Sequence, residues 1–164
     1  MRRLSPLARG LSWVCQFDWA WHVKDAGDEL IHATAVDVGG FGILIRGASG
    51  TGKSSLALRL MAHGAKLVAD DQTFLRRQDN TVWATCPPAI RGAIEARGIG
   101  LLAADALDEA KIALVVDLDC VESERLPPKR QTLLLGVPID LVFGATSGHL
   151  PYGLLQLAHG GRWN

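Results

Sequence analysis

Eight residues in the first third of the chain have the types and spacing of a phosphate-binding loop. The segment from Gly47 to Ser54 reads G-A-S-G-T-G-K-S and fits the pattern G-x-x-x-x-G-K-[ST]. Glycines let such a loop fold around phosphate oxygens with its backbone N–H groups turned inward, and the helix that follows adds its positive N-terminal end. The pattern predicts that Lys53 reaches the β- and γ-phosphates of a nucleotide and that the Ser54 hydroxyl ligates magnesium.

The expected nucleotide-binding residues are the loop and the first residues of the helix after it. They are Gly47, Ala48, Ser49, Gly50, Thr51, Gly52, Lys53, Ser54 and Ser55. An apolar segment precedes the loop and an amphipathic segment follows it, which is the context that such a loop requires. The loop therefore predicts ATP and Mg²⁺ as ligands, but it does not determine the reaction.

Two adjacent aspartates, Asp70 and Asp71, end the segment K-L-V-A-D-D that follows the predicted helix. Successive side chains of a strand point to opposite faces, so one carboxylate can face the metal ion while its neighbour faces an incoming hydroxyl group. That arrangement suits a kinase whose acceptor alcohol must lose a proton. The spacing equally fits an aspartate that only caps a turn, and both interpretations remain open on spacing alone.

The elements around these residues predict an α/β fold with many strands and few helices. Strands are expected over residues 30–38, 41–47, 66–71, 73–78, 81–86, 111–119 and 132–143. Helices are expected over residues 54–63, 103–111 and 151–159. Gly39-Gly40 and Asp79-Asn80 each predict the turn of a hairpin, and the glycine-punctuated segment 89–102 is expected to be mostly loop.

Length and charge exclude several classes of protein. The 164 residues fit one domain, which we expect over residues 30–164 after an N-terminal extension of residues 1–29. The formal net charge is zero and no long basic run occurs, so a nucleic-acid partner is not expected. No segment has the length of a membrane span. The three cysteines lack metal-ligand spacing and predict reduced thiols in the cytoplasm.

Four stretches together resemble HPr kinase/phosphorylase, a family of bacterial protein-serine kinases. The longest is G-A-S-G-T-G-K-S-S-L-A-L-R-L-M-A-H-G-A-K-L-V-A-D-D, residues 47–71. His32 lies in the predicted strand before the loop, where that family has a histidine. The segment I-E-A-R-G-I-G-L-L, residues 94–102, is similar to the family signature Glu-x-Arg-Gly-x-Gly, and S-E-R-L-P, residues 123–127, is similar to a later arginine segment.

The resemblance implies a fold and a reaction. The fold would be a P-loop kinase core of the phosphoenolpyruvate carboxykinase-like type. The reaction would be ATP-dependent phosphorylation of a serine of HPr, a small phosphocarrier of the sugar phosphotransferase system. The resemblance also implies a homo-oligomer, a hexamer in the family. Short forms of the family occur in alphaproteobacteria, and this chain resembles one of them.

The resemblance also implies roles for residues that would otherwise be ordinary. Asp71 would be the general base, with Asp70 supporting it or bound to the metal ion through water, although the sequence does not rank the two. His32 would help to position the reacting groups. Lys53 would hold the transferring phosphate, Ser54 and Glu95 would hold magnesium, and Arg125 would stabilise charge on the phosphoryl group.

The chain departs from the family where a loop associated with dephosphorylation is expected. That place reads L-G-V-P-I-D-L-V-F-G-A-T-S-G-H-L-P-Y-G and lacks the arginines of the family. The sequence thus predicts kinase activity more firmly than phosphorylase activity. Two other functions fit the loop alone: phosphorylation of a small molecule, and sensing of ATP by a regulatory protein without turnover.

Overall fold

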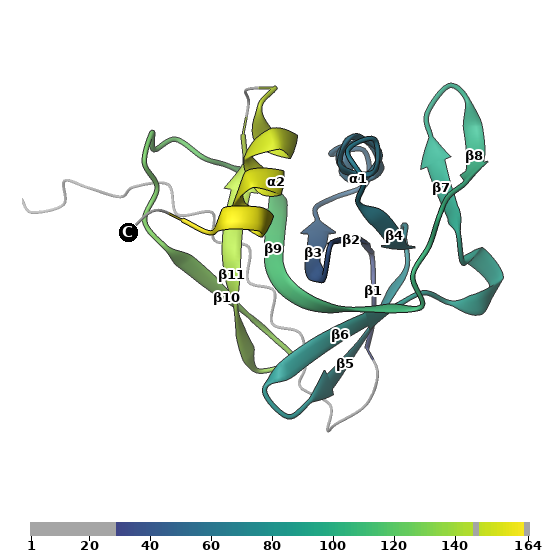
Figure 1. Cartoon of the computed structure of the whole chain (residues 1–164), viewed down its shortest axis with the longest axis horizontal. Coiled ribbons are helices and arrows are strands. Elements are labelled where there is room, and N and C mark those ends of the chain that lie inside the picture. The colour runs from purple at the N-terminus through teal and green to yellow at the C-terminus, as the bar shows by residue number, and fades with distance from the viewer. Residues whose placement is uncertain (1–28, 146–147, 163–164) are drawn as a thin grey trace, which may run out of the picture.

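The computed structural model describes residues 29–145 and 148–162, which form a strand-rich α/β fold (Figure 1). The strands are β1 (Glu29–Ile31), β2 (Ala33–Val38), β3 (Phe41–Arg46), β4 (Lys66–Ala69), β5 (Thr73–Gln78), β6 (Thr81–Thr85), β7 (Ala93–Ala96), β8 (Gly100–Ala103), β9 (Glu109–Val121), β10 (Arg130–Leu134) and β11 (Val137–Gly144). The helices are α1 (Lys53–Met61), the short 3₁₀ helix η1 (Pro88–Ile90) and α2 (Leu150–Gly160). The predicted α/β class with few helices is confirmed.

The long strand β9 organises the main sheet, whose strand order is β1-β5-β6-β9-β3-β2-β4 with β11 and β10 branching from β9. The first residues of β9 pair with β6, and the rest of the strand runs parallel to both β3 and β11. The strand curves strongly along its length, which Figure 1 shows in green. Gly42 allows a close approach of β3 to β9, because a β-carbon there would lie 2.3 Å from the carbonyl oxygen of Lys111.

The centre of the sheet, formed by β2, β3 and the middle of β9, is buried on both faces, and the alternation of side chains along β3 divides the core in two. Ile43 and Ile45 face α1 and α2, where they meet Leu60 and Leu154. Leu44 points to the opposite face and joins a second cluster formed by β5, β6 and β11. Parallel strands covered on both sides read as continuous apolar runs, which is why β3 and the middle of β9 show no polar alternation.

The hairpin predictions at Gly39-Gly40 and Asp79-Asn80 are confirmed. The first joins β2 to β3, with φ of 61° at Gly39 and 94° at Gly40. The second joins β5 to β6, with φ of 54° at Asp79. Glycine and aspartate adopt such backbone angles more readily than most residues, so the local sequence was a reliable guide to these turns.

Two predictions between residues 89 and 111 are wrong. The segment 89–102 is not mostly loop, because β7 and β8 pair there as a separate two-stranded antiparallel sheet. The segment 103–111 is not a helix. Its middle runs alongside β4, where the Leu67 N–H donates to Asp105 and the Leu107 N–H donates to Leu67. A tertiary partner thus satisfies the backbone groups that a helix would otherwise pair internally.

Two predicted strands are each divided. The strand predicted over residues 30–38 breaks at His32, so that β1 pairs with β5 while β2 pairs with β3 and β4. The strand predicted over residues 132–143 is the hairpin of β10 and β11, which turns at Leu135 and Gly136 with φ of 49° and 76°.

The predicted extension over residues 1–29 lies, except for Glu29, outside the described residues, so the domain boundary stays a prediction.

Candidate functional site

The predicted phosphate-binding loop connects β3 to α1 at the end of the sheet. Gly50 and Gly52 have φ of 86° and 99°, in the left-handed region that favours glycine. Gly52 caps α1, and the helix begins at Lys53 with no acidic residue in its first turn. The backbone N–H groups of this helix end are therefore available to an anion without competition from a nearby carboxylate of the helix.

Lys53 is buried in the loop, with only 6% of the residue exposed. Its ammonium donates to the carbonyl oxygens of Gly47 and Ala48 at 2.9 and 3.1 Å, and to Nε2 of His32 at 2.9 Å. An ammonium group has three protons, so these three bonds use all of them. The lysine is thus held at the centre of the loop rather than extended into solvent.

His32 connects Lys53 to Asp71. Because Nε2 accepts from the lysine, Nδ1 carries the ring proton and faces the Asp71 carboxylate at 2.9 Å and the Asp71 carbonyl oxygen at 3.0 Å. The Asp71 side chain is 66% exposed, and its backbone has φ of 67°. The break between β1 and β2 places His32 at this position. The exposed carboxylate is therefore oriented by the histidine and remains open to solvent.

Asp70 has the opposite environment and is 6% exposed. Its Oδ1 accepts from the hydroxyls of Thr34 and Ser54 at 2.7 and 2.8 Å, and its Oδ2 accepts from the backbone N–H of Glu95 at 3.0 Å. These donors come from β2, α1 and β7, so the carboxylate joins three elements at the base of the loop. The sequence could not distinguish the two aspartates, and their burial separates them clearly.

Asp119 also contacts the loop, although the sequence analysis did not select it. Its Oδ1 accepts from the backbone N–H of Ala48 at 2.8 Å. Its own N–H donates to Asp117, whose other carboxylate oxygen accepts from Arg46 at 2.9 Å. The sequence feature that could have indicated Asp119 is the segment D-L-D, residues 117–119, near the end of the apolar strand β9. Only the parallel pairing of β9 with β3 shows that this segment ends beside the loop.

Two other predicted site residues are Glu95 and Arg125. Neither the Glu95 side chain nor Arg125 takes part in the described hydrogen bonds of Lys53, His32 and the two aspartates. The backbone of Glu95 contacts Asp70, while its exposed side chain lies opposite Leu101 in the β7–β8 pair. Arg125 is exposed on the loop after β9 and lines a hollow of about 560 Å³ beside α2 and Phe143. The described contacts do not bring Arg125 to Lys53 or to either aspartate.

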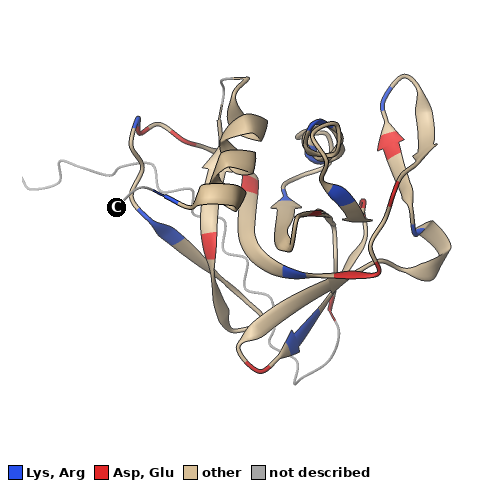
Figure 2. Cartoon of the chain, in the orientation of Figure 1, with Lys and Arg blue, Asp and Glu red and all other residues tan. Residues whose placement is uncertain are grey.

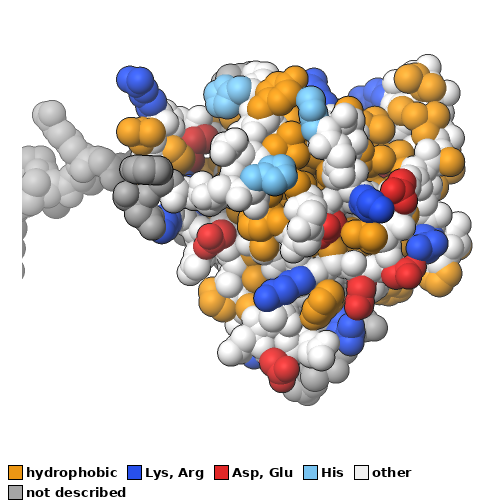
Figure 3. Space-filling view, in the orientation of Figure 1, with side chains coloured by type: hydrophobic (Ala, Val, Ile, Leu, Met, Phe, Trp, Pro, Cys, Tyr) orange, Lys and Arg blue, Asp and Glu red, His pale blue; other side chains and the backbone are white. Residues whose placement is uncertain are grey.

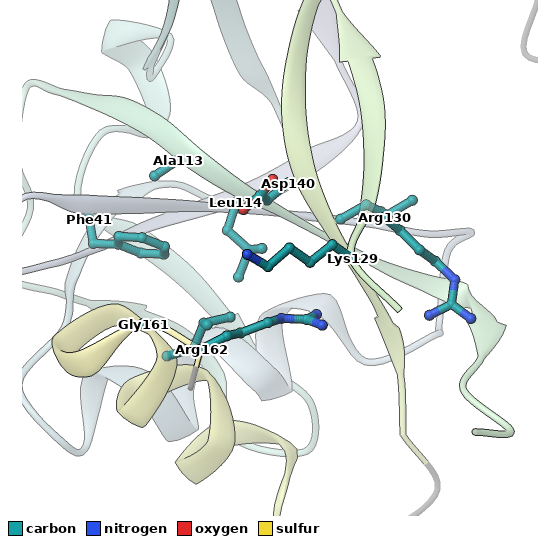
Figure 4. A pocket seen from close by; sticks show the side chains of 10 residues that line it. Phe41, Ala113, Leu114, Lys129, Arg130, Asp140, Gly161 and Arg162 are labelled. Carbon is teal, nitrogen blue, oxygen red and sulfur yellow. The ribbon is translucent and has the colours of Figure 1, made fainter. Parts of the chain in front are cut away.

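A second hollow, of about 270 Å³, also lies apart from the predicted site (Figure 4). Lys129, Arg130 and Arg162 line it together with Phe41 and Asp140. Two of these cations already have partners, because Arg130 pairs with a glutamate and Arg162 donates to proline carbonyl oxygens. The hollow contains none of the residues that the sequence predicts for the site.

Cys86 lies near Asp70 and does not have the properties of a reactive thiol. Burial raises the pKa of its thiol; the positive charge of Arg91 partly opposes this shift and the negative charge of Asp70 adds to it. A raised pKa keeps the thiol protonated at neutral pH, and the protonated form is a poor nucleophile. This agrees with the prediction of an ordinary reduced cysteine. Cys120 is the other cysteine within the described residues.

Comparison with known proteins identifies the family. The family model described as the HPr Serine kinase C-terminal domain matches residues 24–139. The chain belongs to this family. Relatives include the HPr kinase/phosphorylase of Cupriavidus necator, 40% identical over 124 residues, and that of Clostridium botulinum, 35% identical over 128 residues. These alignments cover 68% and 71% of the chain.

The solved structure of the Hpr(Ser) kinase/phosphatase from Coxiella burnetii has the same fold as this HPr kinase C-terminal domain. The TM-score is 0.65 at 25% identity, over 79% of this chain and 93% of that one. The alignments cover only 38% and 42% of the lengths of the Cupriavidus and Clostridium relatives. Among the residues that the structure describes, no helix is both long and apolar enough to cross a membrane.

Proposed function

We propose that the chain is an ATP-dependent protein kinase that phosphorylates a serine of HPr or of a closely related phosphocarrier. One observation supports this most strongly: His32 links the buried Lys53 of the phosphate-binding loop to the exposed carboxylate of Asp71. A phosphate-binding group and a solvent-accessible base therefore stand in one network. The names of the relatives are those of enzymes that act on HPr.

In the proposed reaction the substrate serine approaches Asp71, which is the exposed member of the pair. The serine Oγ attacks the γ-phosphorus of ATP while its proton passes to the Asp71 carboxylate, and the bond from phosphorus to the bridging oxygen of ADP breaks. His32 keeps the carboxylate oriented through its Nδ1–H. Lys53 and the loop N–H groups hold the phosphate oxygens, so most of the catalysis comes from positioning and charge neutralisation.

The oxygen donors beside the loop fit Mg²⁺. Within the described residues no three His, Cys, Asp or Glu side chains form a metal cluster. Mg²⁺ bound with a nucleotide needs only one or two protein oxygens in addition to phosphates and water. The Ser54 hydroxyl and the Asp70 carboxylate, 2.8 Å apart, supply such oxygens, and Glu95 is adjacent through its backbone. The ion would neutralise charge on the transferring phosphate.

The role of Arg125 and the hexamer stay predictions under this proposal. Arg125 would act on the phosphoryl group only if the loop after β9 moved or if a second copy of the chain supplied it, which is compatible with the predicted hexamer. Phosphorylase activity is not proposed, because the segment expected to carry its arginines lacks them. ATP sensing without turnover does not require an exposed, oriented base such as Asp71.

The proposal is tested by incubating the protein with γ-labelled ATP, magnesium and each HPr-type protein of the same genome. The expected result is label on a serine of one of these proteins. Lys53→Met is the inactive control, because it removes the ammonium that holds the phosphates. ATP binding without labelled acceptor would instead identify a sensor, and label on a small molecule would identify a metabolite kinase.

Asp119→Ala should weaken ATP binding by about 10-fold, because the N–H of Ala48 loses a charged acceptor that holds the start of the loop. Asp119→Asn keeps an acceptor oxygen in the same place and should bind ATP within about 3-fold of the original protein. Calorimetric titration with ATP measures both. Equal losses in the two variants would mean that the negative charge of Asp119, rather than its hydrogen bond, matters.

A further inference from the structure

Thr34 is a polar residue in the interior of the protein, with none of its surface exposed. It belongs to β2, where alternate side chains face α1, and Val36 and Val38 on that face pack with apolar residues of the helix. Its Oγ1 donates to Oδ1 of Asp70 at 2.7 Å. A buried hydroxyl needs a hydrogen-bond partner, and within the described part of the chain the Asp70 carboxylate is the partner of Thr34.

The pairing of β2 with β4 brings Thr34 next to Asp70. Ala35 lies opposite Ala69 in the antiparallel register, so the residues one position beyond this pair, Thr34 and Asp70, are also neighbours. On its other side Thr34 lies opposite Ile45 of β3. A β-branched side chain has a restricted χ1, and this one is also enclosed between two strands. Its hydroxyl therefore gives the carboxylate a rigid partner.

The buried carboxylate of Asp70 is stabilised by neutral donors rather than by a cation. Among the residues that the structure describes, no lysine or arginine forms an ion pair with it. Figure 2 shows β2 and β3, in the centre of the sheet, mostly in tan, because each contains a single charged residue. The donors are the hydroxyls of Thr34 and Ser54 and the backbone N–H of Glu95. Each of these bonds to a charged acceptor is stronger than a bond between neutral groups.

The hydrogen bonds of Asp70 determine where the lone pairs of Ser54 point. The Ser54 hydroxyl has one proton and donates it to Oδ1 of Asp70 at 2.8 Å, so its lone pairs are left for a metal ion. Thr34 donates to the same Oδ1, which fills both lone-pair sites of that oxygen. The carboxylate cannot turn without losing the bond to Thr34. The orientation of Ser54 is therefore fixed through Asp70 by a residue of β2.

We infer that Thr34 is a positioning residue for the metal ion of the nucleotide: its hydroxyl fixes Asp70, and Asp70 directs the lone pairs of Ser54 toward the ion. This inference rests on the proposed kinase function with Mg²⁺ and adds to it a residue that does not itself touch the ion. Mg²⁺ demands near-ideal octahedral geometry, so a small turn of one ligand weakens its binding. Loss of a group that orients a metal ligand typically costs about 10- to 100-fold in metal affinity or activity.

The test compares Thr34→Val, which keeps the shape of the side chain without its hydroxyl, with Thr34→Ser, which keeps the hydroxyl. Dissociation constants for ADP, which cannot donate a γ-phosphate, are measured by calorimetry in Mg²⁺ and in EDTA. Thr34→Val should reduce the gain in ADP affinity that Mg²⁺ provides by about 10-fold and change the metal-free constant by less than about 3-fold. Thr34→Ser should keep both quantities within about 3-fold of the original protein, because the donor is retained.

Thr73→Val is the matched control. Thr73 is equally buried, and its hydroxyl donates to the carbonyl oxygen of Ala33 at 2.8 Å, so this variant loses one buried hydrogen bond without removing a partner of Asp70. It should leave the gain from Mg²⁺ unchanged, although both valine variants should unfold at a lower temperature in EDTA. If Thr34→Val did not fold, Thr34→Ala would be measured in its place, with the same expected loss.

The metal dependence of ADP binding reports on this site. Figure 3 shows the acidic side chains of one face scattered among basic and apolar ones, and in residues 29–145 and 148–162 no three His, Cys, Asp or Glu side chains form a metal cluster. Three results would overturn the inference: an equal gain from Mg²⁺ in Thr34→Val and Thr73→Val, an equal loss of ADP affinity with and without Mg²⁺, or an original protein whose ADP affinity does not depend on Mg²⁺.

Phosphoryl transfer to the serine acceptor is the second readout. Thr34→Val should raise the Mg²⁺ concentration for half-maximal transfer by about 10-fold, since the metal ligand is less well oriented. If the original protein bound ADP with Mg²⁺ but transferred no phosphate from ATP, the proposed function would fail while the ADP comparison still decided the role of Thr34.

Discussion

Asp71→Asn is expected to abolish phosphoryl transfer to serine while leaving ATP binding intact. The variant keeps the size and the hydrogen-bonding oxygen of the side chain, so the His32 Nδ1–H retains an acceptor. It loses the ability to take a proton from the serine hydroxyl, which is worth about 10²- to 10⁴-fold in rate for a general base. The side chain is 66% exposed, so the fold should be unaffected.

The measurement combines single-turnover transfer of labelled phosphate to the acceptor protein with calorimetric titration of ATP. The matched control is Asp79→Asn, which removes an exposed carboxylate at the turn between β5 and β6. That control should transfer phosphate at the original rate. A rate for Asp71→Asn within about 3-fold of the original would exclude Asp71 as the base. A parallel loss of ATP affinity would instead assign it to nucleotide binding.

The second large effect is expected at Asp70, and it is an effect on folding stability. Asp70→Ala leaves the hydroxyls of Thr34 and Ser54 and the N–H of Glu95 without their acceptor. Each buried polar group left unpaired costs about 1–3 kcal/mol, and water can enter to reach some of them. We expect the free energy of unfolding to fall by about 3 kcal/mol or more, measured by urea denaturation.

Two further variants show whether the hydrogen bonds cause this loss. Asp71→Ala is the neighbouring control and should change the unfolding free energy by less than about 1 kcal/mol, since its carboxylate is largely solvated. Asp70→Asn keeps one acceptor oxygen but turns an NH₂ group toward the Glu95 N–H or the two hydroxyls. It should therefore lie between the original protein and Asp70→Ala. Similar stabilities for Asp70→Ala and Asp71→Ala would contradict the structural role of Asp70.

Three features could be predicted from the sequence because their causes are local. The loop from Gly47 to Ser54 depends on glycines that permit its backbone angles and on the helix that begins at Lys53. The turns at Gly39-Gly40 and Asp79-Asn80 depend in the same way on residues that tolerate positive φ. The buried strand β9 was visible as an apolar run. In each case, residues close together in the chain carry the whole physical reason.

The segment 89–111 shows where local reasoning failed. Its glycines suggested loop, but Ile94 and Leu102 bury against α1 and hold β7 and β8 together as a hairpin. Its last part suggested helix, but hydrogen bonds to Leu67 keep it extended. Tertiary contacts commonly override a weak local preference, because the burial they provide outweighs the propensity of a few residues.

The sequence by itself determined which chemical groups are present: a phosphate-binding loop with its lysine and serine, and two adjacent carboxylates. The tertiary structure decided what surrounds them. The break at His32 joins Lys53 to an exposed Asp71, while β2, α1 and β7 enclose Asp70. The same fold brings Asp119 to the loop from β9, a strand distant in the sequence. Burial and pairing of this kind depend on contacts between residues far apart in the chain, which no local pattern encodes.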